Sequence, residues 1–189
     1  MMKKKLGFAL CGSFCTHSSA LEVMRDLSHD YDITPIFSYS VRDTDTRFGT
    51  ADALARAVRE ISGHDIISTI VESEKLAANP LDLMMICPCT GNTAAKIANG
   101  ITDTPVTMAA KAHLRSDRPL LIALASNDAM SGNIVNIGTL LQRKNIFFVP
   151  MKQDDITKKP HSLVAEFDKC RISLDKMCEG KQMRPLFLE

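Results

Sequence analysis

Hydroxyl, amide and thiol side chains gather in one short stretch near the middle of the 189-residue chain. Cys89, Thr90, Gly91, Asn92 and Thr93 lie between an apolar run, typical of a buried strand, and a run of good helix formers. A polar loop at the N-terminus of a helix presents free backbone N–H groups and hydroxyls, and the helix dipole favours an anion there. These residue types therefore predict a phosphate-binding turn.

The elements on either side of this turn have predictable limits. Residues 83–87 are all apolar, as expected for a parallel strand that is buried on both faces. Pro88 cannot donate a hydrogen bond to a sheet, so the strand should end there. The helix should begin at Thr93, with Asn92 at a cap-like position before it, and should end at Gly100.

Polar loops also follow three other apolar segments that are typical of strands, at residues 5–11, 32–38 and 119–125. Strands that alternate with helices predict an α/β fold: a three-layer, doubly wound, Rossmann-like and mostly parallel sheet in a single domain, residues 1–189. Such sheets bind ligands beyond the carboxyl ends of their strands, where the strand order reverses. The polar loops should therefore share one edge with the turn at residues 89–93. The three loops contain Gly12, Ser13 and Phe14, then Ser38 and Ser40, and then Ser126 and Asn127.

A longer motif begins inside the turn. Residues 88–103 read Pro-Cys-Thr-Gly-Asn-Thr-Ala-Ala-Lys-Ile-Ala-Asn-Gly-Ile-Thr-Asp. This motif resembles the Pro-Ala-(Ser/Thr)-Ala-Asn-Thr-x-(Ala/Gly)-Lys-x-Ala-x-Gly-x-(Ala/Thr)-Asp signature of the flavoprotein superfamily, which includes the flavin-containing cysteine decarboxylases. The similarity extends from the first strand to about Pro150, and more loosely to the end. It implies a flavodoxin-like flavoprotein fold with a flavin held by the polar loops. The candidate contacts that it implies are Gly12, Ser13, Phe14, Ser38, Ser40, Ser126 and Asn127, together with residues 89–93.

The flavin implied by this resemblance should be FMN rather than FAD. One compact phosphate site is expected, from Gly12, Ser13 and the helix start at residues 90–93, and the chain has no second nucleotide fingerprint for an adenosine half. It also has no G-x-G-x-x-G motif, so a nicotinamide cofactor should bind to another chain.

Within the superfamily, the Cys-Thr-Gly form of the motif, followed by residues 104–115, is closer to the B subunit of an oxidoreductase that acts in spore formation. The resemblance implies a partner A subunit that binds NAD(P), and the cytoplasm of the mother cell as the location. Two alternatives remain open: a non-catalytic subunit that holds flavin or is purely structural, and a stand-alone flavin-dependent decarboxylase or prenyltransferase. The superfamily also implies a homo-oligomer, a trimer or larger, and the apolar tail at residues 186–188 should need cover.

The sequence departs from the decarboxylases at two places. Their catalytic His precedes the motif strand, and the same spacing counted back from Pro88 leads to Glu74, with no His between Asp65 and Ala112. A carboxylate does not replace an imidazole without a shifted pKa, so cysteine decarboxylation is disfavoured and the catalytic residues stay open. In the loop along the flavin, Asp128 adds a charge that would repel an anionic substrate or bind an ammonium group.

Composition excludes several classes of protein. The formal charge is +1 and no basic stripe indicates nucleic-acid binding. Residues 3–5 are lysines, but the apolar run at residues 6–11 is too short for a signal peptide or a membrane span. Arg42 and Arg47 lie in a hydroxyl-rich loop, where they either meet an anionic ligand or are simply solvated.

Four of the six cysteines lie at the ends of two predicted strands. Cys11, Cys15, Cys87 and Cys89 do not have the spacing of a zinc or iron–sulfur knuckle, so no metal site is expected and the thiols should be small core residues. Without an export signal, the thiols should be reduced in a cytoplasm. Cys89, in the predicted loop, is the one thiol to test for reactivity, and its role stays open.

Other local patterns lead to further expectations. Amphipathic periodicity predicts a helix over residues 162–177, and residues 66–71 should form a short strand or an extended approach to the sheet. Ser18 or Ser19 should cap the helix after the first strand. His113 lies near the end of a predicted helix, where a positive charge would complement the helix dipole.

Overall fold

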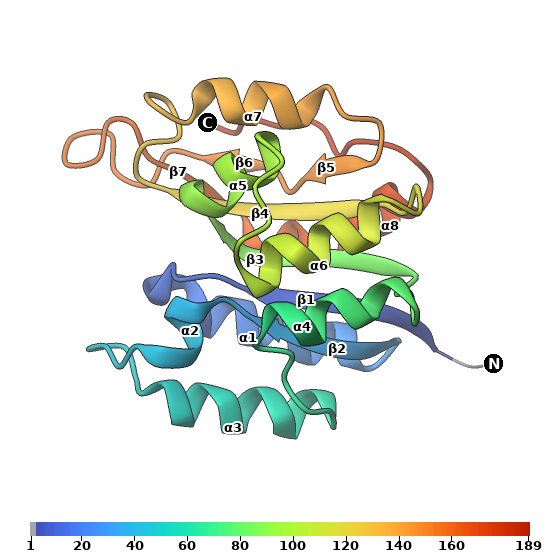
Figure 1. Cartoon of the computed structure of the whole chain (residues 1–189). Coiled ribbons are helices and arrows are strands. Elements are labelled where there is room, and N and C mark those ends of the chain that lie inside the picture. The colour runs from blue at the N-terminus through green and yellow to red at the C-terminus, as the bar shows by residue number, and fades with distance from the viewer. Residues whose placement is uncertain (1–2) are drawn as a thin grey trace.

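A seven-stranded sheet forms the middle layer of the computed structural model, which describes residues 3–189 (Figure 1). The strands are β1 (Lys4–Leu10), β2 (Tyr31–Phe37), β3 (Leu83–Thr90), β4 (Leu120–Ser126), β5 (Ile146–Phe148), β6 (Met151–Lys152) and β7 (Leu163–Ala165). Their order is β2-β1-β3-β4-β7-β6, and β5 pairs with β4 as well. Strands β1 to β5 pair in parallel, whereas β7 pairs antiparallel with both β4 and β6.

Helices cover both faces of this sheet. They are α1 (His17–Ser28), α2 (Tyr39–Asp43), α3 (Ala51–Ser62), α4 (Ile70–Glu74), α5 (Gly91–Ala98), α6 (Pro105–Leu114), α7 (Ile134–Leu141) and α8 (Cys170–Cys178). The buried side chains of α1, α3 and α8 pack on one face, and those of α5, α6 and α7 pack on the other. The predicted α/β fold, doubly wound around a mostly parallel sheet, is confirmed. Among residues 3–189, no helix is both long and apolar enough to cross a membrane.

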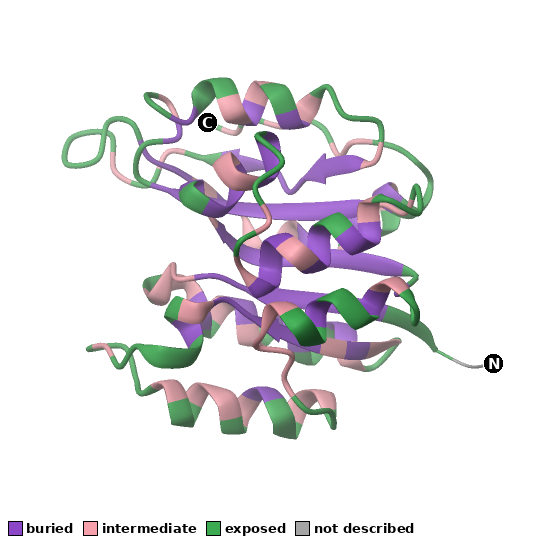
Figure 2. Ribbon diagram, viewed as in Figure 1, coloured by how far each residue is buried: buried purple, intermediate pink, exposed green. Residues whose placement is uncertain are grey.

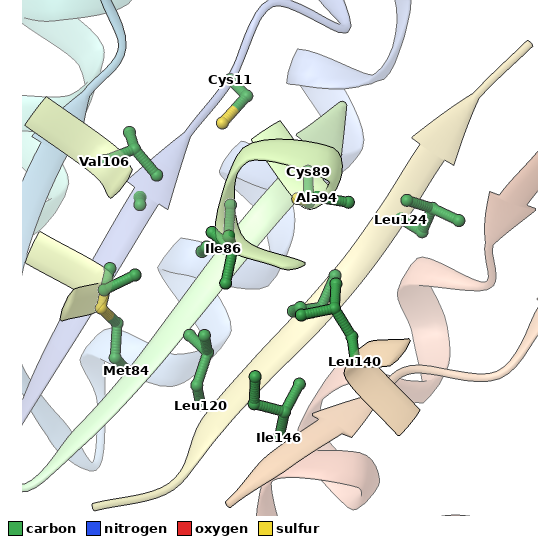
Figure 3. Packing of buried hydrophobic residues seen from close by; sticks show 14 of the residues in the cluster. Cys11, Met84, Ile86, Cys89, Ala94, Val106, Leu120, Leu124, Leu140 and Ile146 are labelled. Carbon is green, nitrogen blue, oxygen red and sulfur yellow. The ribbon is translucent and has the colours of Figure 1, made fainter. Parts of the chain in front are cut away.

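The central strands are buried on both sides, which explains why their sequences are apolar without alternation (Figure 2). Met84 and Ile86 of β3 face the cluster under α5, α6 and α7, and Leu120 of β4 lies beside them (Figure 3). Met85 and Cys87 alternate with them and face the cluster under α1, α3 and α8. The two hydrophobic layers therefore meet across β3 and β4.

The predicted end of β3 and the predicted start of α5 are wrong, whereas Gly100 does end the helix. The strand continues through Pro88 to Thr90, and α5 begins at Gly91 rather than at Thr93. Pro88, which follows a cis peptide bond, falls where the pairing of β3 with β4 shifts register, so the sheet needs no N–H from it. Asn92 is consequently inside the first turn of the helix and does not cap it.

Three other local predictions also need correction. Residues 162–177 are not one helix, because Leu163–Ala165 pair with β6 and β4 and a 3₁₀ turn precedes α8. Ile67 bridges to Ile36 at the sheet edge as an extended approach, but the chain turns into α4 from Ile70. The first helix starts at His17, so its predicted cap residues Ser18 and Ser19 lie inside it, and Thr16 precedes it.

The C-terminal tail docks on its own chain. Met151 of β6 donates its N–H to the Leu186 carbonyl and accepts from the Leu188 N–H, both at 2.9 Å. The side-chain amide of Gln182 accepts from the Phe148 N–H at 2.8 Å and donates to the Phe148 carbonyl at 2.6 Å. The apolar tail thus finds part of its cover within the same chain.

His113 is buried rather than a surface cation. Its Nε2 lies 2.8 Å from the Pro119 carbonyl, and its Nδ1 is buried with no partner in the described chain. Burial lowers the pKa of His113 below the ordinary 6.5, so the ring is held neutral and does not supply the charge that its position predicted.

We expect this neutral His113 to make stability fall with acidification. Below about pH 6.5 the unfolded chain takes up a proton that the folded chain excludes, so stability is complete above that pH and decreases below it. Thermal melts of the His113→Gln protein between about pH 7 and pH 5 should show a shallower decline than wild type. The same change at exposed His161 should leave the wild-type slope, and equal slopes for all three proteins would contradict the prediction.

Candidate functional site

A cavity of about 680 Å³ opens at the point where the direction of winding reverses. β1 is followed by a helix on one face of the sheet, whereas its neighbour β3 is followed by α5 on the other face. The loops after β1, β3 and β4 meet there, at the left in Figure 1. Of the predicted contact residues, the cavity is lined by Gly12, Ser13, Phe14, Thr90, Gly91, Asn92, Ser126 and Asn127.

The loop after β1 requires glycine at position 12. A Cβ built on Gly12 would lie 2.8 Å from the Ser40 hydroxyl, so the backbone passes close to the next loop. Ser40 bonds to Ser38 at 3.0 Å, and Ser38 caps α2 by accepting from the Val41 N–H. The structure thus places Ser38 and Ser40 behind Gly12, where they support the cavity wall without lining it.

The start of α5 forms the opposite wall. Thr90 caps the helix by accepting from the Thr93 N–H at 3.3 Å. The hydroxyl of Thr93 points inward and donates to Cys11 Sγ at 3.3 Å, so Thr93 lies beneath the cavity. The N–H groups of Gly91 and Asn92 begin the helix and have no intrahelical acceptor. Both residues line the cavity, which places the positive end of the helix dipole at its wall.

The loop after β4 packs directly against this helix start. Ser126 donates its hydroxyl to Asp128 Oδ1, and Asn133 Nδ2 donates to Asp128 Oδ2 at 2.8 Å. A Cβ on Gly91 would collide with the Ser126 hydroxyl, with Asn133 Nδ2 at 2.7 Å and with Asp128 Oδ1 at 2.9 Å. Glycine is therefore the residue that lets α5 and the β4 loop approach each other.

Cys11, Cys87 and Cys89 are buried core residues, as predicted, whereas the prediction is wrong for Cys15, which is exposed and lines the cavity. The predicted place of Cys89 in a loop is also wrong. Cys89 lies at the end of β3 with its side chain buried beside Ala94, and burial raises its pKa well above the usual value (Figure 3). Burial raises the pKa of Cys11 to about 11. Cys87 lies on the other face of the sheet, near Cys170, so it cannot join the thiols of Cys11 and Cys89. Residues 3–189 contain no group of three metal-ligating side chains.

The remaining charged candidates lie away from the cavity wall. Arg42 forms a bidentate ion pair with Asp43, at 2.6 and 2.7 Å, and also donates to the Ser68 carbonyl. Arg47 stacks over the Phe48 ring at 4.8 Å. Glu74 is exposed on α4. None of these three side chains could therefore be assigned a ligand from its present position.

Sequence reasoning missed the third side of the cavity. The hairpin between β6 and β7 contributes Asp154 and Lys159, which form an ion pair, and β7 contributes Val164. Phe48 reaches the cavity from the loop before α3. The sequence shows only a polar segment between the short apolar runs that become β6 and β7. It does not show which strands the second run, β7, pairs with.

Comparisons with known proteins agree with this geometry. The flavoprotein family model matches residues 1–171. The chain is 38% identical to the B subunit of dipicolinate synthase from Bacillus subtilis (strain 168), over 98% of this chain and 94% of that protein. The crystal structure of the dipicolinate synthase B subunit from Bacillus halodurans C superposes with a TM-score of 0.90, at 37% identity, over 100% of this chain and 99% of that one.

A more distant structure shares the fold alone. The dodecameric FMN-dependent UbiX-like decarboxylase from Escherichia coli O157:H7 superposes with a TM-score of 0.62 at 20% identity, over 77% of this chain and 79% of that one. The long matches to the two Bacillus proteins are far closer in sequence. The chain therefore belongs to the flavoprotein family and, within it, to the B subunits of dipicolinate synthase.

Proposed function

We propose that the chain is the FMN-binding B subunit of a dipicolinate synthase, which oxidises dihydrodipicolinate to dipicolinate in sporulation together with an A subunit that binds NAD(P). Support comes from the similarity to two dipicolinate synthase B subunits over nearly their whole lengths. The described chain offers one phosphate-type cradle and its sequence has no dinucleotide motif, which fits a division of cofactors between two subunits.

The observation that carries the flavin proposal is the convergence of the loops after β1, β3 and β4 on one cavity that has the start of α5 in its wall. Two glycines allow these loops to pack closely against their neighbours. A side chain at Gly12 or Gly91 would strike the neighbouring loop, and α5 directs its N-terminal N–H groups to the cavity wall between them. Such a cradle suits a phosphate, and the cavity of about 680 Å³ has room for one flavin mononucleotide. When bound, the flavin would supply electron-transfer chemistry, while Ser126 and Asn127 would contact the ring.

The remaining parts of the proposal concern assembly and location. The UbiX-like relative is dodecameric, and we infer a homo-oligomer, a trimer or larger, built from single-domain chains in the cytoplasm. The alternatives are a subunit that holds flavin without chemistry of its own and a stand-alone decarboxylase or prenyltransferase. Glu74 is exposed on α4 and does not line the cavity, so it gives the decarboxylase alternative no support.

The purified protein tests these alternatives directly. A yellow protein that releases FMN on denaturation, identified by mass, would support the proposal, and release of FAD would contradict it. Oxidation of dihydrodipicolinate should require both chains, and the A subunit should co-purify with this one. Oxidation by the A subunit alone at an equal rate would leave this chain without a catalytic role. A monomer in light scattering at micromolar concentration would contradict the oligomer.

Asn92→Asp should weaken FMN binding without loss of stability. Thr90, not Asn92, caps α5, so the cap survives, and a carboxylate in the first helical turn improves the dipole interaction. The same charge lies at the cavity wall and would repel a phosphate. We expect the affinity for FMN to fall by at least about tenfold, or about 1.4 kcal/mol, in isothermal titration, with an unchanged or higher melting temperature.

The matched control is Asn79→Asp, which introduces the same charge near the amino end of β1, beside Lys5 Nζ at 3.0 Å. This change should leave FMN affinity at the wild-type value. Equal affinities for the wild-type and Asn92→Asp proteins would remove Asn92 from the site.

A further inference from the structure

A chain of five polar side chains begins at the cavity and ends at the far end of α5. Ser126 donates to Asp128, which also accepts from Asn133 at 2.8 Å. Asn133 accepts from Asn136 at 2.9 Å, and Asn136 accepts from Asn99 at 3.1 Å. This series leaves Asn133, which is buried, with both ends of its amide bonded.

The direction of these hydrogen bonds is set at both ends. Asn99 Nδ2 also donates to the Ala95 carbonyl at 2.8 Å, and a carbonyl can only accept. Asn136 and Asn133 therefore each direct their amide oxygen toward Asn99 and their NH₂ group toward Asp128. A carboxylate also only accepts, so Asp128 receives Asn133 on one oxygen and the Ser126 proton on the other.

This arrangement decides what Ser126 can offer to a ligand. Its hydroxyl proton is committed to Asp128, and only lone pairs remain for the cavity that Ser126 lines. A free serine hydroxyl could either donate or accept, whereas this one is restricted to accepting. The wall formed by the β4 loop should therefore favour a ligand that presents an N–H group and disfavour one that presents only acceptors.

The geometry points to Asp128 as a positioning residue that makes Ser126 an obligate acceptor, so that this wall selects a ring N–H. This inference rests on the proposed flavin site and deepens it, because oxidised flavin carries its ring N–H at N3, between two carbonyl groups. Asp128 also lines the cavity, and the inferred role is exerted through Ser126, whose proton it accepts. The Asp128 carboxylate then favours ligands that present a hydrogen-bond donor to Ser126. Its charge alone would predict a different role, which is to bind an ammonium group or to repel an anionic substrate.

An isosteric change at Asp128 should turn the Ser126 hydroxyl from an acceptor into a donor toward the cavity. In Asp128→Asn, the new amide oxygen must face Asn133 Nδ2, so the new NH₂ group faces Ser126 and donates to it. Ser126 then turns its own proton toward the cavity and meets a ligand N–H as a second donor. We expect affinity for FMN to fall at least about tenfold, or about 1.4 kcal/mol. Ser126→Ala should lose less, because it removes the acceptor without presenting a donor.

FMN methylated at N3 separates hydrogen bonding from charge. Wild type should bind FMN at least about tenfold more tightly than the methylated flavin, and Ser126→Ala and Asp128→Asn should bind the two within about twofold of each other. The double variant Ser126→Ala/Asp128→Asn should bind both flavins with nearly the affinities of Ser126→Ala alone. If Asp128 acts only by its charge, its loss beside a phosphate would strengthen binding of both flavins alike, which would overturn the inference.

Melting curves test the hydrogen-bond direction without a ligand. Asp128→Asn keeps every bond of the series and should melt within about 2 °C of wild type. Asp128→Ala leaves the buried Asn133 Nδ2 group without its acceptor and should melt at least about 2–4 °C lower. Equal melting temperatures for the two variants would overturn the proposed direction of these hydrogen bonds. Wild-type protein that binds neither flavin would overturn the proposed flavin site and this inference together, whereas tight FMN binding with no loss in Asp128→Asn would overturn the inference alone.

Discussion

Gly91→Ala should lower the melting temperature of the protein and abolish tight FMN binding. The added Cβ would collide with the Ser126 hydroxyl and lie 2.7 Å from Asn133 Nδ2 and 2.9 Å from Asp128 Oδ1. These atoms are held by their own hydrogen bonds, so α5 must move away from the β4 loop. Overpacking of this kind costs about 1–3 kcal/mol, which corresponds to a decrease of at least about 2–4 °C in a chain of this size.

The same substitution at Gly138 provides the matched control. Gly138 lies inside α7, and a Cβ there meets nothing within 4 Å. Alanine is a better helix former than glycine by about 0.5–1 kcal/mol, so Gly138→Ala should raise the melting temperature and leave FMN affinity unchanged. If both variants melt above wild type, the close packing of α5 against the β4 loop is wrong.

Ile122→Ala should have the largest effect on stability. Ile122 is fully buried at the centre of β4, where it pairs with Ile86 of β3 and Phe148 of β5. Truncation removes contacts on the face covered by α5, α6 and α7 and leaves a cavity between the sheet and these helices that cannot collapse easily. Loss of about 2–5 kcal/mol is expected from urea unfolding, measured as a lower midpoint with an unchanged slope.

Ile156→Ala makes the same chemical change at an exposed side chain in the β6–β7 hairpin. It should shift the unfolding midpoint little, because a side chain that remains in water on folding loses no burial. If both variants lost a similar free energy of unfolding, burial of the β4 side chains would not explain the stability of the fold.

The convergence of the loops after β1, β3 and β4 could be predicted because it follows from topology. Parallel strands end at one edge, and apolar runs without alternation identify parallel strands buried on both faces. Gly12, Gly91 and Ser126 could therefore be placed at one cavity without knowledge of any long-range contact. The helix at residues 51–62 was equally predictable, because its cap Thr50 and its terminator Gly63 are local signals.

Features that depend on distant partners could not be predicted. Pro88 has no N–H for a sheet hydrogen bond, so its position alone predicts the end of a strand. The register shift between β3 and β4 accommodates it, and this shift depends on β4. The same extension of β3 makes Thr90 the cap of α5 and buries Cys89, which reversed two local interpretations. Residues 163–165 fit a helical pattern as well as a strand until pairing with β6 decides between them.

The side-chain amide of Gln182 has a consequence for behaviour at high concentration. An open strand edge is a template on which another chain can add a strand, and this is a common route to aggregation. Gln182 occupies both the N–H and the carbonyl of Phe148 on β5, and the backbone of the tail occupies those of Met151 on β6. Strand addition at Phe148 and Met151 would therefore first require Gln182 and the tail to be displaced, which hinders edge-to-edge growth of concentrated chains at these residues.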